Sequence, residues 1–165
     1  MAHVTELARP IDDGYCIGCG PHARVGLHMR FEESDDGTVE SRVTVGRPFQ
    51  GWRDVVHGGI VALLLDEAMA YAAAARGIVG VTGDLKLRFR KAVPVGAPLC
   101  VRGKVAWQRR NVLGIEASVH DNAGTLLASG QGSFVARGTL APGEHLGARP
   151  TERATRDSAR MRLGD

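Results

Sequence analysis

Apolar and polar residues alternate along six stretches in the middle of the chain. A period of two residues is typical of β-strands with one buried face. Turn-forming residues at 33–37, 94–98, 109–111 and 121–124 separate most of these stretches. The apolar positions of the expected strands are Leu27, Met29 and Phe31; Val39, Val43 and Val45; Leu85, Leu87 and Phe89; Leu99, Val101, Val105 and Trp107; Leu113, Ile115, Ala117 and Val119; and Leu126, Ala128 and Phe134.

One block between the second and third strands, from about Gly59 to Arg76, has a different pattern. It is apolar nearly all round, and such a helix is normally buried on most of its sides. Its alanines, and glycines elsewhere in the chain, allow a helix and a sheet to approach closely. The order β-β-α-β-β-β-β therefore predicts an α+β fold, in which a curved antiparallel sheet of about six strands wraps around one long central helix.

The two ends of the chain differ in composition from this middle part. Residues 1–24 form a glycine-rich leader, and residues 25–136 hold the periodic segments. Residues 137–165 contain six arginines and four acidic residues with hardly any apolar periodicity, so we expect a disordered tail. The sequence thus predicts one domain with a leader and a tail.

Composition and charge exclude several classes of protein. The 165 residues are 44% apolar and 24% charged, with a net charge of only +3 and few aromatic residues, which argues against a nucleic-acid partner. The longest aliphatic run, Ile60 to Leu65, is too short to span a bilayer. No secretory signal is visible at the N-terminus, and three cysteines do not form a disulfide framework. We expect a cytoplasmic protein with no membrane partner.

An acidic residue, Asp66, lies in the middle of the apolar helix. Burying an unpaired carboxylate costs several kcal/mol, so Asp66 must be paired, reach water or have a raised pKa. Either it is a structural residue held by backbone amides of a neighbouring strand, or it is a functional acid. Glu67 lies about 100° around the helix and could be the functional acid instead, or face solvent.

The helix is preceded by His57, Gly58 and Gly59. The first amides of a helix lack partners and lie at the positive end of its dipole, so they can bind an oxyanion. Without further information, the three residues could equally form only a tight loop that enters the helix.

Together these elements resemble a known family. The stretch from Phe49 to Met69, FQGWRDVVHGGIVALLLDEAM, resembles the hot-dog acyl-CoA thioesterases, in particular the PaaI-like and 4-hydroxybenzoyl-CoA thioesterase group. The resemblance continues through residues 81–89 to the turn at 94–96, and includes the leader segment CIGCG at 16–20. It implies the hot-dog fold and hydrolysis of an acyl- or aroyl-CoA.

The same resemblance implies roles for individual residues. Asp66 occupies the position of the catalytic carboxylate, and Gly58 that of the glycine whose amide polarises the thioester carbonyl. Thr82 matches a Ser or Thr that positions the water or the acid, and His57 shapes the loop. Gly51 stands where several relatives have Asn, and the adjacent Gln50 is expected to supply that contact. Further expected substrate contacts are Gln50, Gly59, Glu67, Arg88 and Arg90.

The basic residues of the third expected strand have two interpretations. Lys86, Arg88 and Arg90 share one strand face, where they could meet the phosphates of coenzyme A. That face could equally be a solvated outer surface.

Helix geometry requires more than one protomer at each site. Gly58 and Asp66 are eight residues apart on one helix, about 12 Å at a rise of 1.5 Å per residue. One carbonyl cannot contact both groups, so they should come from different protomers, and an antiparallel pair of helices would form two such sites. We expect a homodimer or a dimer of dimers.

Other functions and a metal site have weaker support in the sequence. A non-catalytic acyl-CoA sensor would not need Asp66, and a hot-dog hydratase or dehydratase would need a His/acid pair that is not visible beyond His57. Cys16, Cys19, His22 and His28 suggest zinc, but a second strong ligand pair is missing, and a glycine-rich loop is favoured. We expect no metal, and no cofactor apart from the CoA of the substrate.

Overall fold

A seven-stranded antiparallel sheet forms the body of the protein in the computed structural model, which describes residues 5–7 and 13–139. The strand order across the sheet is β1-β2-β3-β5-β6-β7-β4. The strands are β1 (Thr5–Leu7), β2 (Phe31–Glu33), β3 (Val39–Thr44), β4 (Ile78–Phe89), β5 (Pro98–Arg109), β6 (Val112–Asp121) and β7 (Leu126–Thr139).

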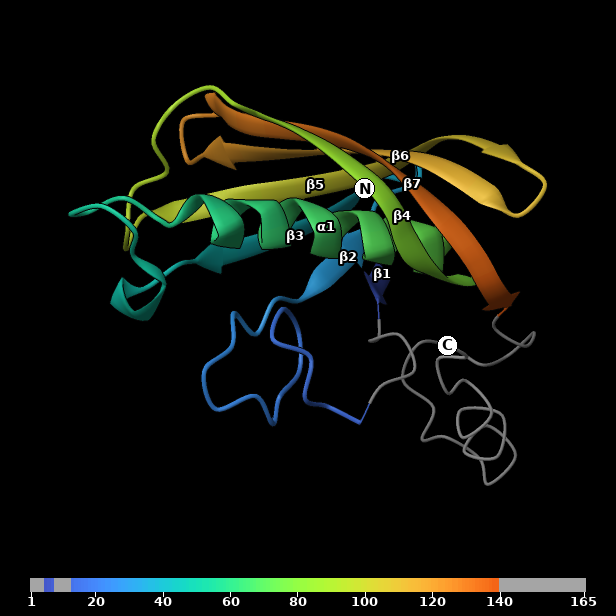
Figure 1. Cartoon of the computed structure of the whole chain (residues 1–165), viewed down its shortest axis with the longest axis horizontal. Coiled ribbons are helices and arrows are strands. Elements are labelled where there is room, and N and C mark those ends of the chain that lie inside the picture. Colours follow the sequence, from blue (N-terminus) through green and yellow to red (C-terminus); the bar gives the residue numbers. More distant parts are fainter. Residues whose placement is uncertain (1–4, 8–12, 140–165) are drawn as a thin grey trace.

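One helix, α1 (Gly58–Ala75), lies along the inner face of this sheet. It contacts every strand from β2 to β7, and Figure 1 shows the sheet curving over it. A short 3-10 helix, η1 (Arg47–Phe49), lies in the connection between β3 and α1. The predicted α+β hot-dog architecture is confirmed.

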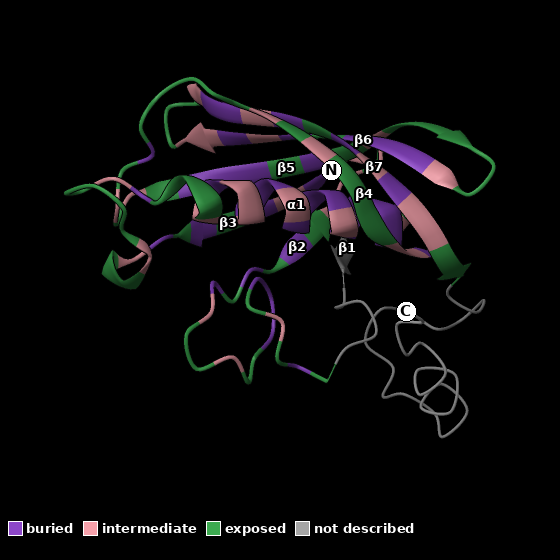
Figure 2. Cartoon of the chain, in the orientation of Figure 1, coloured by how far each residue is buried: buried purple, intermediate pink, exposed green. Residues whose placement is uncertain are grey.

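The core lies between α1 and the sheet. Figure 2 shows buried residues along the helix and along the strands that cover it. The approach is closest at Gly103 on β5, where a Cβ atom would overlap the carbonyl oxygen of Ala68 on α1. The expected role of small residues between sheet and helix is therefore observed at this contact.

Two differences from the predicted elements have a common cause. Leu27 and Met29 alternate as in a strand, but they precede β2, and their amides donate to the carbonyls of Ile17 and Gly18 at 2.9 Å each. The leader also supplies β1, which pairs with β2. The common cause is the leader, which forms backbone hydrogen bonds with residues 27–29 and with β2. Periodicity identified the segment at 27–31 but could not show that the leader pairs with it.

The helix α1 would also be long and apolar enough to cross a membrane, by length and composition alone. Its contacts with six strands identify it as the core helix of this fold. The predicted disordered tail cannot be compared, because residues 140–165 lie outside the described residues. The division into leader, domain and tail stays a prediction.

Candidate functional site

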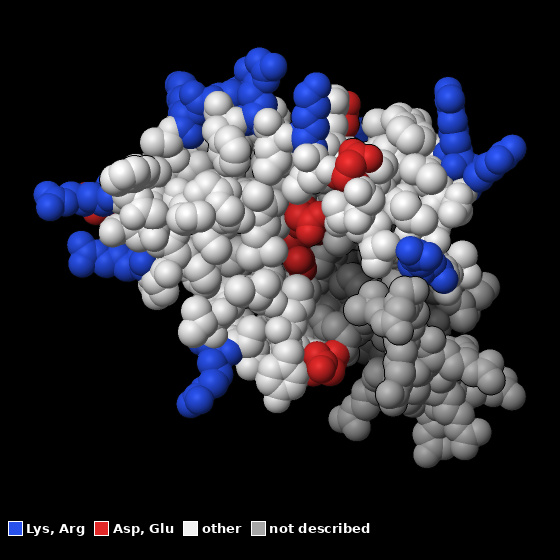
Figure 3. All heavy atoms as spheres, viewed as in Figure 1, with Lys and Arg blue, Asp and Glu red and all other residues white. Residues whose placement is uncertain are grey.

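Asp66 on α1 and Thr82 on β4 form a hydrogen-bonded pair. The hydroxyl of Thr82 donates to Oδ1 of Asp66 at 2.7 Å. Asp66 is partly exposed and Thr82 is exposed, so the carboxylate is both paired and accessible to water. Figure 3 shows acidic side chains gathered over α1 in the middle of one face, with most basic side chains around its periphery. Among the open interpretations of Asp66, the structure favours a carboxylate paired with a side chain over one held by strand amides.

A β-bulge at Gly83 directs Thr82 toward the helix. Thr82 lies opposite Phe134 on β7 and Asp84 lies opposite Ser133, so Gly83 is an extra residue in β4. In a regular strand Thr82 and Asp84 would share one face. Because of the bulge, Thr82 shares the inner face with the buried Phe134, while Asp84 turns outward and accepts a hydrogen bond from Ser133. Strand alternation alone could not reveal this change of face.

The helix start is built around His57. His57 is the N-cap of α1, and its Nδ1 accepts a hydrogen bond from the Gly59 amide at 2.9 Å. Within the described residues, the Gly58 amide has no hydrogen-bond partner. A Cβ at Gly58 would meet only the Phe89 ring, at 3.9 Å, so this position is open. The geometry leaves one helix N-terminal amide available to an acceptor atom.

Gln50 orders the loop that precedes the helix. Its Oε1 accepts a hydrogen bond from the Asp54 amide at 3.0 Å, and Asp54 adopts a positive φ of 61°. A Cβ at Gly51 would lie 3.1 Å from the Cα of His57, so the loop packs closely against the helix cap. Gln50 thus has a structural partner here, and its expected contact with substrate stays a prediction, as does that of Gly59.

Glu67 points into the protein. Only 8% of it is exposed, so the expectation that it could face solvent is wrong. Its carboxylate oxygens lie 3.6 and 3.7 Å from the Sγ of Cys16. Burial, and secondarily a hydrogen bond with Glu67, raises the pKa of the neighbouring Cys19 thiol far above its usual range. The two acids of the sequence motif therefore lie in different surroundings.

Three side chains form a cluster that the sequence did not predict, namely those of Glu67, Cys16 and Cys19. One donor atom from each lies within 4.8 Å of the others. The two histidines weighed as zinc ligands have other contacts: Nδ1 of His28 is 3.0 Å from the Gly20 carbonyl oxygen, and His22 contacts the Tyr15 ring. The third member comes from α1, far along the chain, so local spacing gave no signal for it.

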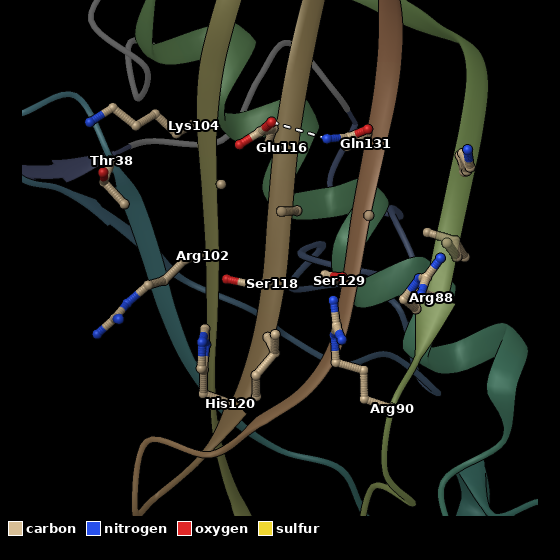
Figure 4. A pocket seen from close by; sticks show the side chains of 16 residues that line it. Thr38, Arg88, Arg90, Arg102, Lys104, Glu116, Ser118, His120, Ser129 and Gln131 are labelled. Atoms are coloured by element: carbon tan, nitrogen blue, oxygen red, sulfur yellow. Dashed lines mark hydrogen bonds between the residues drawn. The ribbon is translucent and has the colours of Figure 1, made fainter.

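Arg88 and Arg90 line a groove of about 600 Å³ on the outer face of the sheet. Gly103 of β5 faces α1, so the alternating Arg102 and Lys104 face away from the helix, and both line this groove. Figure 4 shows these basic side chains around the groove. Within one protomer, the two arginines and the Asp66–Thr82 pair thus lie on different faces of the sheet. A contact with CoA phosphates stays a prediction.

The chain is similar to known thioesterase-superfamily proteins. A family model described as the thioesterase superfamily matches residues 54–128, which include the helix start, Asp66 and Thr82. Among the curated proteins, none matches the chain.

Solved structures share the fold. The crystal structure of a thioesterase superfamily protein is 30% identical with a TM-score of 0.71; the match covers 74% of this chain and 60% of that one. The chain therefore spans less than two thirds of that protein.

Two more distant structures agree in fold. A hypothetical thioesterase from Streptococcus pneumoniae TIGR4, crystallised with coenzyme A, is 19% identical with a TM-score of 0.65, covering 68% of this chain and 91% of that one. PaaI from the phenylacetic acid degradation operon of E. coli is 21% identical with a TM-score of 0.64, covering 69% and 83%. With the matched region and the shared fold, the expected resemblance is confirmed: the chain has the hot-dog fold and is similar to proteins of the thioesterase superfamily.

Proposed function

We propose that the protein is a thioesterase that hydrolyses an acyl- or aroyl-CoA to the free acid and coenzyme A. The observation that carries the proposal is the 2.7 Å hydrogen bond from Thr82 to Asp66. It holds a water-accessible carboxylate in a helix that is largely apolar, where a carboxylate is costly and has to be stabilised. A structural role alone would not require access to solvent.

Related structures support the substrate class. The pneumococcal protein was crystallised with coenzyme A, and a protein from Streptococcus mutans UA159 with acetyl CoA. Two further structures of the pneumococcal protein have alanine in place of an aspartate and of a threonine. These two positions are sixteen residues apart, the same separation as Asp66 and Thr82 here.

In the proposed mechanism, the amide of Gly58 donates to the thioester carbonyl oxygen. The negative charge that develops on this oxygen is stabilised by the amide and by the helix dipole. Asp66 accepts a proton from the attacking water, or attacks the carbonyl directly to give an anhydride that water then cleaves. Thr82 orients the carboxylate, and His57 fixes the loop that carries the amide. The leaving CoA thiolate takes up the proton of the attacking water, either directly or from Asp66, so the products are the acid and the CoA thiol.

A second copy of the chain completes each site in this proposal. Gly58 and Asp66 are eight residues apart on α1, about 12 Å along the helix, so they cannot contact one carbonyl. Among the described strands, β4 pairs only with β7, which leaves a twelve-residue edge unpaired beside Asp66. An antiparallel partner would bring its Gly58 to Asp66 twice, by symmetry.

A release assay for free thiol tests the proposal. Purified full-length chain is incubated with a panel of acyl- and aroyl-CoAs, beside the Asp66→Asn variant. Loss of the general base should lower kcat by roughly 10² or more. Asp84→Asn is the matched control, because Asp84 is likewise a solvent-accessible carboxylate that accepts a hydrogen bond from a hydroxyl, but it is more exposed than Asp66 and faces outward.

The outcome also separates the alternatives. Thiol release that is equal in wild type and Asp66→Asn would contradict the assigned role of Asp66. Saturable binding of an acyl-CoA with no release from any member of the panel would favour the sensor. Hydration of an unsaturated acyl chain, with the thioester intact, would favour the hydratase.

A further inference from the structure

The leader loop brings two thiols to a buried carboxylate. Cys16 is partly buried, and Cys19 and Glu67 are 2% and 8% exposed. The Sγ of Cys16 lies 3.6 Å from one oxygen of Glu67 and 3.7 Å from the other. Together with the Sγ of Cys19, these side chains offer one potential ligand atom each, and the three atoms lie within 4.8 Å of one another. Three potential metal ligands thus converge on one point at the boundary between leader and helix.

The loop backbone holds this arrangement in place. The Gly20 amide donates to the Cys16 carbonyl at 2.7 Å, which closes the turn between the two cysteines. A Cβ at Gly18 would lie 2.5 Å from the Glu67 carboxylate, so a side chain at this position would collide with it. Glycine lets the loop lie directly on Glu67. The backbone contacts of the loop therefore help to position the potential ligand atoms.

Each sulfur also has a hydrogen-bond donor beside it. The Gly18 amide donates to the Sγ of Cys16 at 3.3 Å. At Cys19, burial and then a hydrogen bond with Glu67 raise the pKa of the thiol, and a hydrogen bond with Tyr71 acts in the opposite direction. Donors of this kind stabilise a thiolate and orient it toward a metal ion. These donors would offset part of the cost of forming thiolates in this buried region.

We propose that Cys16, Cys19 and Glu67 bind one Zn²⁺ ion. Two thiolates and a carboxylate are ligands that Zn²⁺ accepts, whereas Mg²⁺ and Ca²⁺ require oxygen ligands throughout. Tetrahedral zinc with Zn–S near 2.3 Å and Zn–O near 2.0 Å places sulfur and oxygen ligands about 3.5 Å apart. The separations of 3.6 and 3.7 Å match this value. Three protein ligands leave one position for water.

The net charge of the cluster does not change when two thiols and an ionised Glu67 bind Zn²⁺. Zn²⁺ binding displaces one proton from each of the two thiols, and these protons pass to solvent. The cluster carries a charge of −1 as two thiols and a carboxylate, and −1 as two thiolates, a carboxylate and Zn²⁺. Binding adds three metal–ligand bonds without increasing the net charge of the buried region. Uncompensated buried charge is what makes isolated buried ions unfavourable. The partly exposed Cys16 gives the ion a route from solvent.

The bound ion would join the leader to α1 next to Asp66. Cys16 and Cys19 belong to the leader, and Glu67 directly follows Asp66 on the helix. The site is separate from the Asp66–Thr82 pair, so the proposal does not depend on the thioesterase activity. A bound zinc ion would explain why Glu67 is buried under the loop that contains Cys16 and Cys19.

Metal analysis and cobalt spectroscopy test the site. Full-length chain, purified with reducing agent and Zn²⁺ and then passed through a metal-free column, should retain one Zn²⁺ per chain by mass spectrometry. Metal-free chain titrated with Co²⁺ should develop thiolate-to-cobalt charge-transfer absorption with the intense visible bands of a tetrahedral site. Both readouts are independent of catalysis.

Variants assign the ligands. Cys16→Ser and Cys19→Ser should weaken Zn²⁺ binding by more than the roughly 10- to 100-fold that follows loss of a partner hydrogen-bonded to a ligand. Glu67→Gln should weaken binding while keeping the charge-transfer absorption. Cys100→Ser is the matched control, because Cys100 is also buried but lies on β5, outside the cluster. It should retain full binding.

Two results would overturn the proposal. One is reduced wild-type chain that takes up neither Zn²⁺ nor Co²⁺ with sulfur charge transfer. The other is an equal loss of binding in Cys100→Ser and Cys16→Ser. If the cysteine variants do not fold, the wild-type cobalt spectrum and Glu67→Gln still decide between the outcomes.

Discussion

Asp66 and Glu67 are consecutive residues of α1, and their carboxylates lie in opposite surroundings. Asp66 is partly exposed and accepts a hydrogen bond from Thr82 on β4. Glu67 is buried against Cys16 of the leader. Consecutive residues of an α-helix point about 100° apart, so one turn presents one acid to the β4 side and the other to the leader. This separation is the basis for assigning the reaction to Asp66 and the metal to Glu67.

Thr82→Val should lower kcat with little change in KM. Valine keeps the shape of threonine but cannot donate to Asp66, so the carboxylate loses its orientation. Hydrogen bonds to charged groups contribute about 1.5–3 kcal/mol, which corresponds to a decrease of roughly 10- to 100-fold if the whole term acts in the transition state. Steady-state kinetics with the best substrate of the panel measure the change.

Thr82→Ser is the matched control for this prediction. Serine keeps the hydroxyl and should retain most of the activity. If Thr82→Ser is as slow as Thr82→Val, the methyl group rather than the hydrogen bond matters. Equal kcat for all three proteins would show that the hydrogen bond has no part in turnover.

The sequence predicted those features that depend on local patterns. Alternation identified the strands, and the apolar block predicted a helix from Gly59 to Arg76, where the structure has Gly58–Ala75. Asp66 stood out because a charge in an apolar helix needs a reason. The two consecutive glycines, Gly58 and Gly59, also indicated where the helix begins.

Features that depend on long-range contacts could not be predicted in this way. The burial of Glu67 depends on a leader loop 51 residues earlier in the chain. The bulge at Gly83 reverses the face of Thr82 without altering the apolar alternation that follows it. The outer-face position of Arg88 depends on which side of the sheet α1 covers. Each of these depends on tertiary packing rather than on periodicity.

Gly103→Ala should destabilise the fold. Its Cβ would overlap the backbone oxygen of Ala68, which cannot rotate away, so helix and sheet must separate. Overpacking of this kind costs typically about 1–3 kcal/mol in the free energy of unfolding. Urea unfolding followed by circular dichroism measures the loss.

Gly138→Ala serves as the control for Gly103→Ala. Gly138 lies in β7, and nothing within 4 Å would meet a Cβ there. Its free energy of unfolding should be unchanged or slightly higher. A Gly103→Ala variant as stable as Gly138→Ala would contradict the close approach of α1 and β5.

His120 should make the fold less stable in mild acid. Burial, and then the nearby Arg102, lowers the pKa of His120 below its usual 6.5, and the more weakly opposing charges are Asp121 and Glu40. As pH falls below about 6.5, His120 binds a proton in the unfolded chain more readily than in the folded one. The free energy of unfolding therefore decreases, until the pH has fallen below the lowered pKa of His120 in the folded state. In His120→Gln, this part of the acid dependence should disappear.

Urea unfolding at about pH 7.5 and about pH 5.5 measures this difference as a change in free energy with pH. The wild type should lose more unfolding free energy between the two conditions than His120→Gln does. The same loss in both proteins would assign the acid sensitivity to other groups.

The shared site makes a prediction about mixtures of inactive variants. In Gly58→Val a side chain blocks the oxyanion position, yet its first atom would meet only the Phe89 ring at 3.9 Å, so the fold should persist. Asp66→Asn removes the base with little change in shape. Each homodimer should be inactive, because every site then has one lesion. The two variants are unfolded and refolded together in equal amounts, and native mass spectrometry measures the heterodimer.

If each site takes Gly58 from one protomer and Asp66 from its partner, a heterodimer has one site with both lesions and one with neither. Random association makes about half of all dimers mixed, so about a quarter of wild-type activity should return. If both groups came from the same protomer, every site in the mixture would have one lesion and no activity would return. An inactive mixture with heterodimers present would therefore reject the site between protomers, whereas recovered activity requires that Gly58 of one chain serves Asp66 of the other.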